Sequence, residues 1–168
     1  TGLQDFAEFA APLLALQKGS SEELLEQRRQ AFFAAAQAAE PMAATEPVTL
    51  PGPWSAHGLG DFDGVVDYAR TVALPVQFRG KDLRLQFGAI DDMDTVFVHG
   101  ERVCGSEVDG LWSRPRDYVV PAQHTNVETL ELLVRVFDTG GEGGFTGSAD
   151  DLRLTVAGDP SGAVLSLA

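Results

Sequence analysis

Hydrophobic and polar residues alternate in short runs over the last two thirds of the chain. The cleanest run, Thr129–Phe137, has an apolar residue at every even position, while Glu131 and Arg135 lie among the odd ones. Since successive side chains of a strand point to opposite faces, we expect Leu132 and Val134 to be buried. Other runs of this kind occupy residues 65–75, 83–87, 95–98, 152–156 and 163–167. Turns rich in Gly, Pro and Asp separate these runs without an intervening helical pattern, which predicts an antiparallel β-sandwich rather than a parallel α/β sheet.

Residues 1–46 carry a different pattern. Apolar residues recur at roughly helical spacing over Leu3–Leu14. Ser20–Glu23 has the composition of a capping box, in which a serine and a glutamate satisfy the first backbone amides of a helix. We therefore expect a helical segment over residues 1–46, whose second helix runs toward Ala39, in front of a β domain over residues 47–168. Two roles remain open for this segment: it packs on the sandwich, or it joins the domain to a partner.

Composition and charge narrow the possible partners. The chain has 168 residues, of which 44% are hydrophobic and 22% charged, as in a globular domain with a substantial core. Its net charge of −13 disfavours nucleic acid, because a phosphate-binding face is normally basic. No apolar run approaches the length of a membrane span, so we expect no membrane partner. The single Cys104 excludes an intrachain disulfide. Because the chain begins with Thr1 rather than Met, we expect it to be a fragment of a larger protein.

A family resemblance lies in the central passage, from Leu85 to Gly100. It resembles the passage L-x-x-G-x-I-D-D-x-D-x-x-x-V-N-G of the β-sandwich inserted in sialate O-acetylesterases. That module is similar to the sugar-binding domain of family 2 glycoside hydrolases and to the wider galactose-binding-like group. Further matching pieces follow in order over 50–167, so the resemblance implies a mainly β, antiparallel jelly-roll sandwich behind the helical segment. The chain departs from the family at Asp67 and Ala69, which replace Trp and Arg, and at His99, which replaces a turn Asn.

The esterases that carry this insert resemble SGNH hydrolases, which need a Gly-Asp-Ser block and an Asp-x-x-His block. This chain has neither, since Gly158–Ser161 only mimics the first and no histidine has an aspartate three residues before it. We therefore expect no catalytic residue and interpret the chain as a non-catalytic accessory domain. The resemblance implies an SGNH-type catalytic domain of the same parent chain as its partner, in a secreted or periplasmic bacterial protein. A self-standing carbohydrate-binding module and a structural spacer are the alternatives.

Four residues in the polar stretch after the central strands form a candidate carbohydrate site. They are Trp112, Arg114, Arg116 and Tyr118. An aromatic face stacks on a sugar ring, and arginine donates hydrogen bonds to hydroxyl or carboxylate groups. A glycan is therefore a candidate partner. For the last two residues we favour a structural role, in which they fix a long loop through Asp94 or Asp92, and we expect the first two to be exposed.

Three aspartates at the corner between two central strands form a candidate metal site. Asp91, Asp92 and Asp94 offer carboxylate oxygens, which hard cations such as Ca²⁺ prefer. Their spacing matches no EF-hand, and aspartates at a corner are more often turn-formers, which is the interpretation we favour. The sequence indicates no other cofactor.

Overall fold

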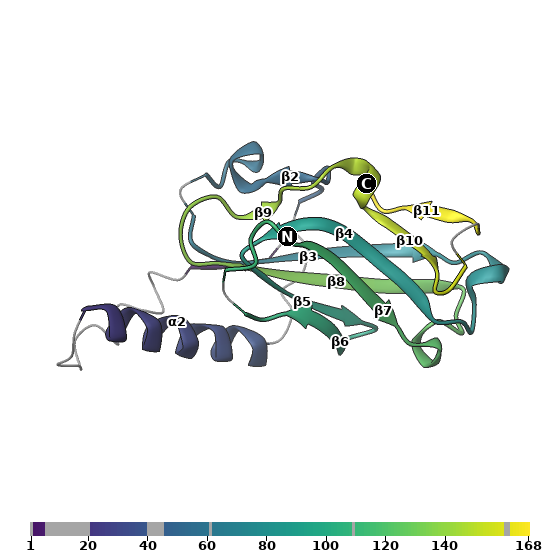
Figure 1. Ribbon diagram of the computed structural model, residues 1–168, viewed down its shortest axis with the longest axis horizontal. Coiled ribbons are helices and arrows are strands. Elements are labelled where there is room, and N and C mark those ends of the chain that lie inside the picture. Colours follow the sequence, from purple (N-terminus) through teal and green to yellow (C-terminus); the bar gives the residue numbers. More distant parts are fainter. Residues whose placement is uncertain (1, 6–20, 40–45, 61, 109, 160–161) are drawn as a thin grey trace.

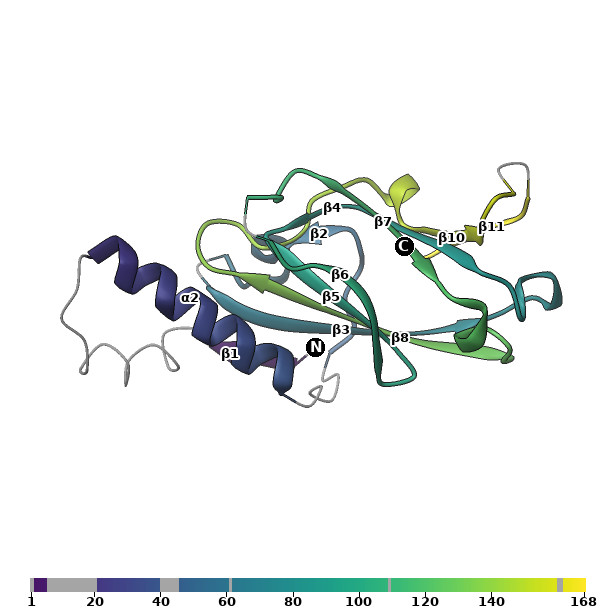
Figure 2. The same ribbon diagram turned by 60° about the horizontal axis from the view of Figure 1, so that its bottom comes forward.

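The computed structural model describes residues 2–5, 21–39, 46–60, 62–108, 110–159 and 162–168. Two antiparallel sheets lie face to face, and helix α2 (Ser21–Ala38) lies against the outer side of one of them (Figures 1 and 2). This confirms the mainly β, antiparallel sandwich that the sequence predicts. Within the described residues, no helix is both long enough and apolar enough to cross a membrane.

The strands pair across long sequence distances. They are β1 (Gly2–Asp5), β2 (Gly52–Pro53), β3 (Gly64–Ala73), β4 (Leu83–Asp91), β5 (Met93–Val98), β6 (Glu101–Ser106), β7 (Pro115–Val120), β8 (Thr129–Asp138), β9 (Gly144–Phe145), β10 (Arg153–Val156) and β11 (Val164–Ser166). Short 3-10 turns connect some of them: η1 (Trp54–His57), η2 (Val76–Phe78), η3 (Ala122–His124) and η4 (Ala149–Asp151). One sheet has the order β1-β3-β8-β5-β6. The other has the order β11-β10-β4-β9-β2, and β7 also pairs with β4.

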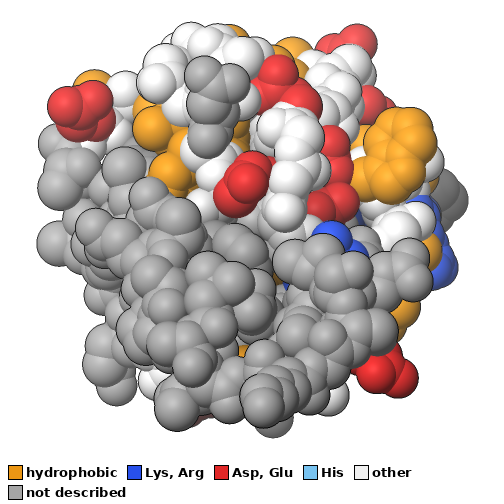
Figure 3. Space-filling view, turned by 90° about the vertical axis from the view of Figure 1, so that its left-hand side faces the viewer, with side chains coloured by type: hydrophobic (Ala, Val, Ile, Leu, Met, Phe, Trp, Pro, Cys, Tyr) orange, Lys and Arg blue, Asp and Glu red, His pale blue; other side chains and the backbone are white. Residues whose placement is uncertain are grey.

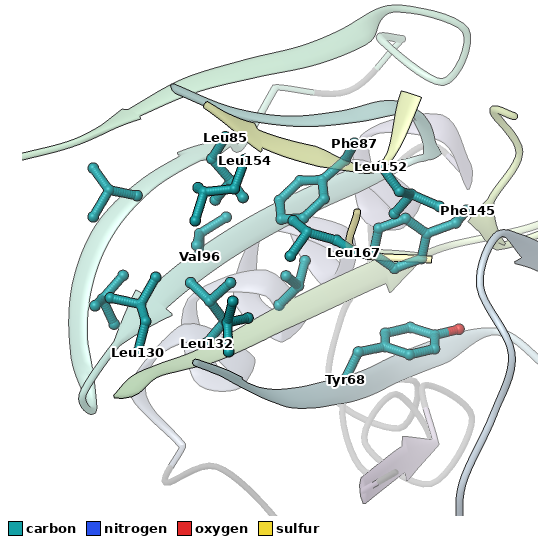
Figure 4. Packing of buried hydrophobic residues seen from close by; sticks show 14 of the residues in the cluster. Tyr68, Leu85, Phe87, Val96, Leu130, Leu132, Phe145, Leu152, Leu154 and Leu167 are labelled. Carbon is teal, nitrogen blue, oxygen red and sulfur yellow. The ribbon is translucent and has the colours of Figure 1, made fainter. Parts of the chain in front are cut away.

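The core lies between the two sheets. Leu132 and Val134 on β8 are each 5% exposed, which confirms that the even positions of this strand face inward. Leu85 and Phe87 on β4 approach them from the opposite sheet, and Figure 4 shows these two side chains on the side of the core opposite Leu130 and Leu132. The alternation of apolar and polar residues therefore identifies correctly which residues of both strands face the core.

The N-terminal residues correct one expectation. Gly2–Asp5 form strand β1, which pairs antiparallel with Gly64–Asp67 of β3, so the predicted helix is wrong for these four residues. The rest of that predicted helix and the serine of the predicted capping box fall on residues 6–20, which lie outside the described residues. The second predicted helix is present as α2. Residues 2–5 are thus part of the five-stranded sheet, and not of a separate helical segment.

The second half of helix α2 packs on the outer face of the five-stranded sheet. Phe32 and Ala36, each 2% exposed, pack on Phe137 of β8 and on neighbouring side chains of β3 and β5. Arg135 of β8 ties the helix to the sheet, because it bonds the Asp67 carboxylate and also donates to the carbonyl oxygen of Ala36. The described part of the helix therefore packs on the sandwich, which explains why odd positions of β8 are buried as well.

Candidate functional site

The residues of the candidate carbohydrate site divide between a strand and a loop. Arg116 and Tyr118 lie on strand β7, not in the long loop that the sequence indicated. Trp112 and Arg114 lie in the segment between β6 and β7. The difference arises because β7 alternates polar and apolar residues on an outer strand, a pattern that resembles a polar loop until its partner β4 is known.

Arg116 makes a saturated hydrogen-bond network in the interior. Its side chain is 1% exposed, and its Nε donates to Asp94 Oδ1 at 2.5 Å. Its Nη2 donates to the carbonyl oxygens of Ile90 (2.7 Å) and Asp92 (2.8 Å). Its Nη1 donates to two further carbonyls, at 2.8 and 2.6 Å. These bonds use all five donors of a guanidinium, so none remains for a sugar.

Tyr118 completes this network. Its hydroxyl lies 2.7 Å from Asp94 Oδ2 and 2.9 Å from Ser106 Oγ. Both carboxylate oxygens of Asp94 therefore have partners inside the protein. Burial raises the pKa of Asp94, while its bonds to Arg116 and Tyr118 act in the opposite direction. The geometry supports the structural role that the sequence favoured for the Arg116–Tyr118 pair.

The same network holds the loop that carries Trp112. The two remaining acceptors of Arg116 are the carbonyl oxygens of Leu111 and Arg114, which flank the tryptophan on both sides. The amide of Arg114 also donates to the carbonyl of Leu111 at 3.0 Å. Trp112 is 57% exposed, and Arg114 is exposed too, as expected. A buried arginine thus fixes a short loop whose aromatic ring faces solvent.

An open hollow of about 390 Å³ lies beside this loop. Its wall is mainly polar and includes Ser106, Glu107, Arg114 and Asp117. Glu107 forms an ion pair with Arg102. Burial acts to raise the pKa of Glu107, but hydrogen bonds from Gln37 and Arg102 outweigh it and lower that pKa. A hollow with hydroxyl, carboxylate and guanidinium groups at its wall has the chemistry to bind a small polar ligand.

The three aspartates of the candidate metal site separate in the structure. Asp91 and Asp92 stay together at the β4–β5 corner, but Asp94 points to Arg116 and Tyr118. Asp138, at the end of β8, takes the place of Asp94 in this group. Ligand atoms of Asp91, Asp92 and Asp138 all lie within 4.8 Å of one another. Sequence reasoning missed Asp138, although the pairing of Met93 with Phe137 places it beside the corner.

Asp138 is unusual among these carboxylates. It is 0% exposed, and neither of its side-chain oxygens has a hydrogen-bond partner at normal length and angle, although the backbone of Gly140 lies near enough to favour its charged form. Burial, followed by the charge of Asp92, raises the pKa of Asp138 to about 7. Burial, followed by contact with Asp92, likewise raises the pKa of Asp91 to about 7. Figure 3, which views the end of the sandwich at the left of Figure 1, shows acidic side chains gathered in the upper half of this end.

The part of the chain that the structure describes contains no site in which a histidine could activate a serine as a nucleophile. Within it, no serine is hydrogen-bonded to a histidine. The serine hydroxyls bond elsewhere: Ser55 donates to Glu142, Ser148 donates to Asp151, and Ser106 accepts from Tyr118. A serine becomes a good nucleophile only when a base takes its proton.

Comparison with known proteins gives the fold but no family. No protein-family profile matches the sequence, and no curated protein matches it. Among solved structures, a β-glucuronidase of Bacteroides uniformis is similar over 67% of this chain and 15% of its own, with 19% identity and a TM-score of 0.52.

Two further structures are similar to the same degree. A GH2 β-galacturonidase of Eisenbergiella tayi bound to glycerol has a TM-score of 0.51 and 18% identity, over 66% of this chain and 20% of its own. A putative β-galactosidase of Bacteroides fragilis also has a TM-score of 0.51, with 19% identity over 61% of this chain and 18% of its own. The chain therefore has the β-sandwich fold of a domain in GH2 enzymes and spans one fifth or less of these proteins.

Proposed function

We propose that the chain is a non-catalytic accessory β-sandwich domain of a larger carbohydrate-active hydrolase, an esterase that resembles sialate O-acetylesterases. The observation that carries the proposal is the likeness of this sandwich to one domain of much longer sugar hydrolases, of which it spans 15–20%. The esterase parent rests on the resemblance of the passage from Leu85 to Gly100. On this proposal the partner is an SGNH-type catalytic domain of the same polypeptide.

The saturated network around Arg116 suits such a role. It makes the loop around Trp112 a fixed projection, because the backbone on both sides of the ring is bonded to a buried guanidinium. A rigid loop on a sheet can be placed beside the active site of a neighbouring domain without loss of conformational entropy on each encounter. The domain would then help to admit or orient a glycan while the catalytic serine lies elsewhere in the parent.

We expect the 168-residue chain to release no acetate above the buffer rate. Acetyl release from O-acetylated sialic acid and from p-nitrophenyl acetate measures this directly. The physical reason is that the described serines have no histidine base. Turnover that disappears when one serine or one histidine is replaced would make the chain an enzyme and end the accessory interpretation.

The coding sequence on either side of these residues tests the parent. A Gly-Asp-Ser block before Thr1 or an Asp-x-x-His block after Ala168 supports the esterase. A glycoside hydrolase catalytic domain in the same reading frame would keep the accessory role but overturn the esterase parent. A polypeptide with no catalytic domain at all would contradict the proposal.

A second candidate function is a self-standing carbohydrate-binding module, which the 57% exposure of Trp112 on a fixed loop favours. If it binds sugar, the affinity should lie in the millimolar region, as expected for one stacked ring and a few hydrogen bonds. Calorimetric titration with sialic acid and with uronic acids should then show binding that Trp112→Ala abolishes. Val76→Ala, which changes an exposed side chain outside this loop and its hollow, is the control and should bind as the unmodified chain does. Binding that survives Trp112→Ala would place the sugar elsewhere.

A further inference from the structure

We propose that Asp91, Asp92 and Asp138 bind a single divalent cation, Ca²⁺, which joins the β4–β5 corner to the end of β8. The three side chains come from two strands and from the turn between β4 and β5, and their ligand atoms lie within 4.8 Å of one another. Asp94, the third acid of the corner in the sequence, takes no part because Arg116 and Tyr118 occupy both of its oxygens.

The first argument is the state of Asp138. A carboxylate that is 0% exposed normally has hydrogen-bond donors or a cation beside it, because the loss of water around an unpaired charge is costly. Neither oxygen of Asp138 has a hydrogen-bond partner at normal length and angle; the backbone of Gly140, which favours the charged form, lies outside that geometry. Its ligand oxygen instead points to the two carboxylates of the corner. A cation at the shared point satisfies all three groups at once.

The second argument concerns the cations that the protein itself supplies. Arg116 is a positive group close enough to influence Asp91, yet its five donors are committed to Asp94 and to four backbone carbonyls. Asp92 Oδ2 receives only long contacts, from the amide of Thr139 at 3.4 Å and from its hydroxyl at 3.5 Å. Glu142 and Asp63 add further negative charge to this region. The carboxylates therefore face one another without a neutralising side chain bonded to them.

The ligand set favours calcium. Ca²⁺ takes six to eight oxygen ligands at about 2.3–2.6 Å, so oxygens on opposite sides of the ion lie about 4.6–5.2 Å apart. A spread of at most 4.8 Å fits inside this shell. Three carboxylates, each able to bind through one or two oxygens, can provide three to six of these ligands, and water can supply the rest. Mg²⁺ demands a smaller and stricter octahedron and keeps more of its water.

The position gives the ion a structural consequence. Asp138 is followed directly by the β8–β9 segment, in which Glu142 accepts hydrogen bonds from the amide and hydroxyl of Ser55 at 2.9 and 2.7 Å. The carbonyl of Gly143 accepts from the amide of Trp54 at 2.8 Å, and a Cβ at Gly143 would lie 2.5 Å from the indole ring. An ion at the three aspartates fixes one end of a segment whose other end already lies against Trp54.

The test uses the 168-residue chain after treatment with EDTA and exchange into metal-free buffer. Calorimetric titration with CaCl₂ should give about one ion per chain. At a hundredfold excess over the dissociation constant, the melting temperature should rise by about 5–10 °C. MgCl₂ at the same concentration should give a smaller rise. Amide hydrogen exchange in residues 139–143 should slow when calcium is added.

Asp138→Asn is the decisive variant. In EDTA it should melt cooperatively, at or above the temperature of the unmodified chain, because it removes a buried like charge. Calcium should then shift its melting temperature by about 1 °C or less. Asp150→Asn, at an exposed aspartate away from the cluster, is the matched control and should keep the full calcium response.

Asp91→Asn provides a second variant at a half-buried position, where an amide is easily accommodated. It should also lose most of the calcium-dependent shift. The proposal is overturned if the unmodified chain shows neither binding heat nor a melting shift with CaCl₂. It is equally overturned if both Asp138→Asn and Asp91→Asn respond to calcium as the unmodified chain does.

Discussion

Arg116→Ala should lower the free energy of unfolding by about 3–5 kcal/mol, because it leaves Asp94 as an uncompensated buried charge. Asp94 is 0% exposed and would keep only the hydroxyl of Tyr118 as a partner. Four backbone carbonyls would each lose one hydrogen bond at the same time, and that of Leu111 would keep only the amide of Arg114. Urea denaturation followed by circular dichroism measures the change. Arg116→Lys keeps the charge but loses the planar fork of donors. Its free energy of unfolding should lie between those of the unmodified chain and of Arg116→Ala.

Arg84→Ala is the matched control for this prediction. Arg84 on β4 also pairs with an aspartate, Asp117 of β7, but both side chains are exposed to solvent. Water and salt screen such a pair, so its removal should leave the urea midpoint nearly unchanged. If Arg116→Ala and Arg84→Ala had equal midpoints, the buried network would not have the stabilising role that its geometry indicates.

Leu132→Ala should destabilise the chain by about 2–5 kcal/mol, through loss of apolar burial and creation of a cavity. The side chain is 5% exposed and lies between the sheets (Figure 4). It also lines a partly open, mainly apolar pocket of about 260 Å³, together with Phe87, Val134 and Phe145. The truncation therefore enlarges a space that neighbouring side chains already leave unfilled, so we expect little relaxation into it.

Leu133→Ala, one residue along the same strand, tests the register. Leu133 points to the other face of β8 and is only half-buried, so the same deletion should cost clearly less. Thermal or urea unfolding of the two variants gives the comparison. Equal losses, or a loss of a few tenths of a kcal/mol for Leu132→Ala, would mean that the faces of β8 are assigned incorrectly.

The sequence predicts strands well where one face meets the core. β4 and β8 alternate apolar and polar residues, and both strands lie where the pattern places them. β1 was missed because four residues cannot distinguish a strand from a helix by periodicity, and its pairing partner is 59–65 residues away. The burial of Arg135 was missed as well, because it depends on a helix that covers the outer face of β8.

The candidate site was predictable only in its local parts. The pairing of Arg116 and Tyr118 with an acid of the corner was expected, and the exposure of Trp112 as well. Which aspartates share a point in space depends on the register of β5 against β8. That register turns Asp94 toward β7 and brings Asp138 to the corner. The sequence between Asp94 and Asp138 contains no local pattern that predicts this register.

The contact between α2 and β8 also bears on the order in which the chain can fold during synthesis. The carbonyl of Ala36 meets Arg135, a residue that follows it by 99 positions. At about 5–20 residues per second, the ribosome needs about 5–20 s to complete this stretch. Phe32 and Ala36 have no complete sheet to pack on during that interval. Chains that stop short of β8 would therefore present an apolar helix face, and they are the species that a chaperone would recognise.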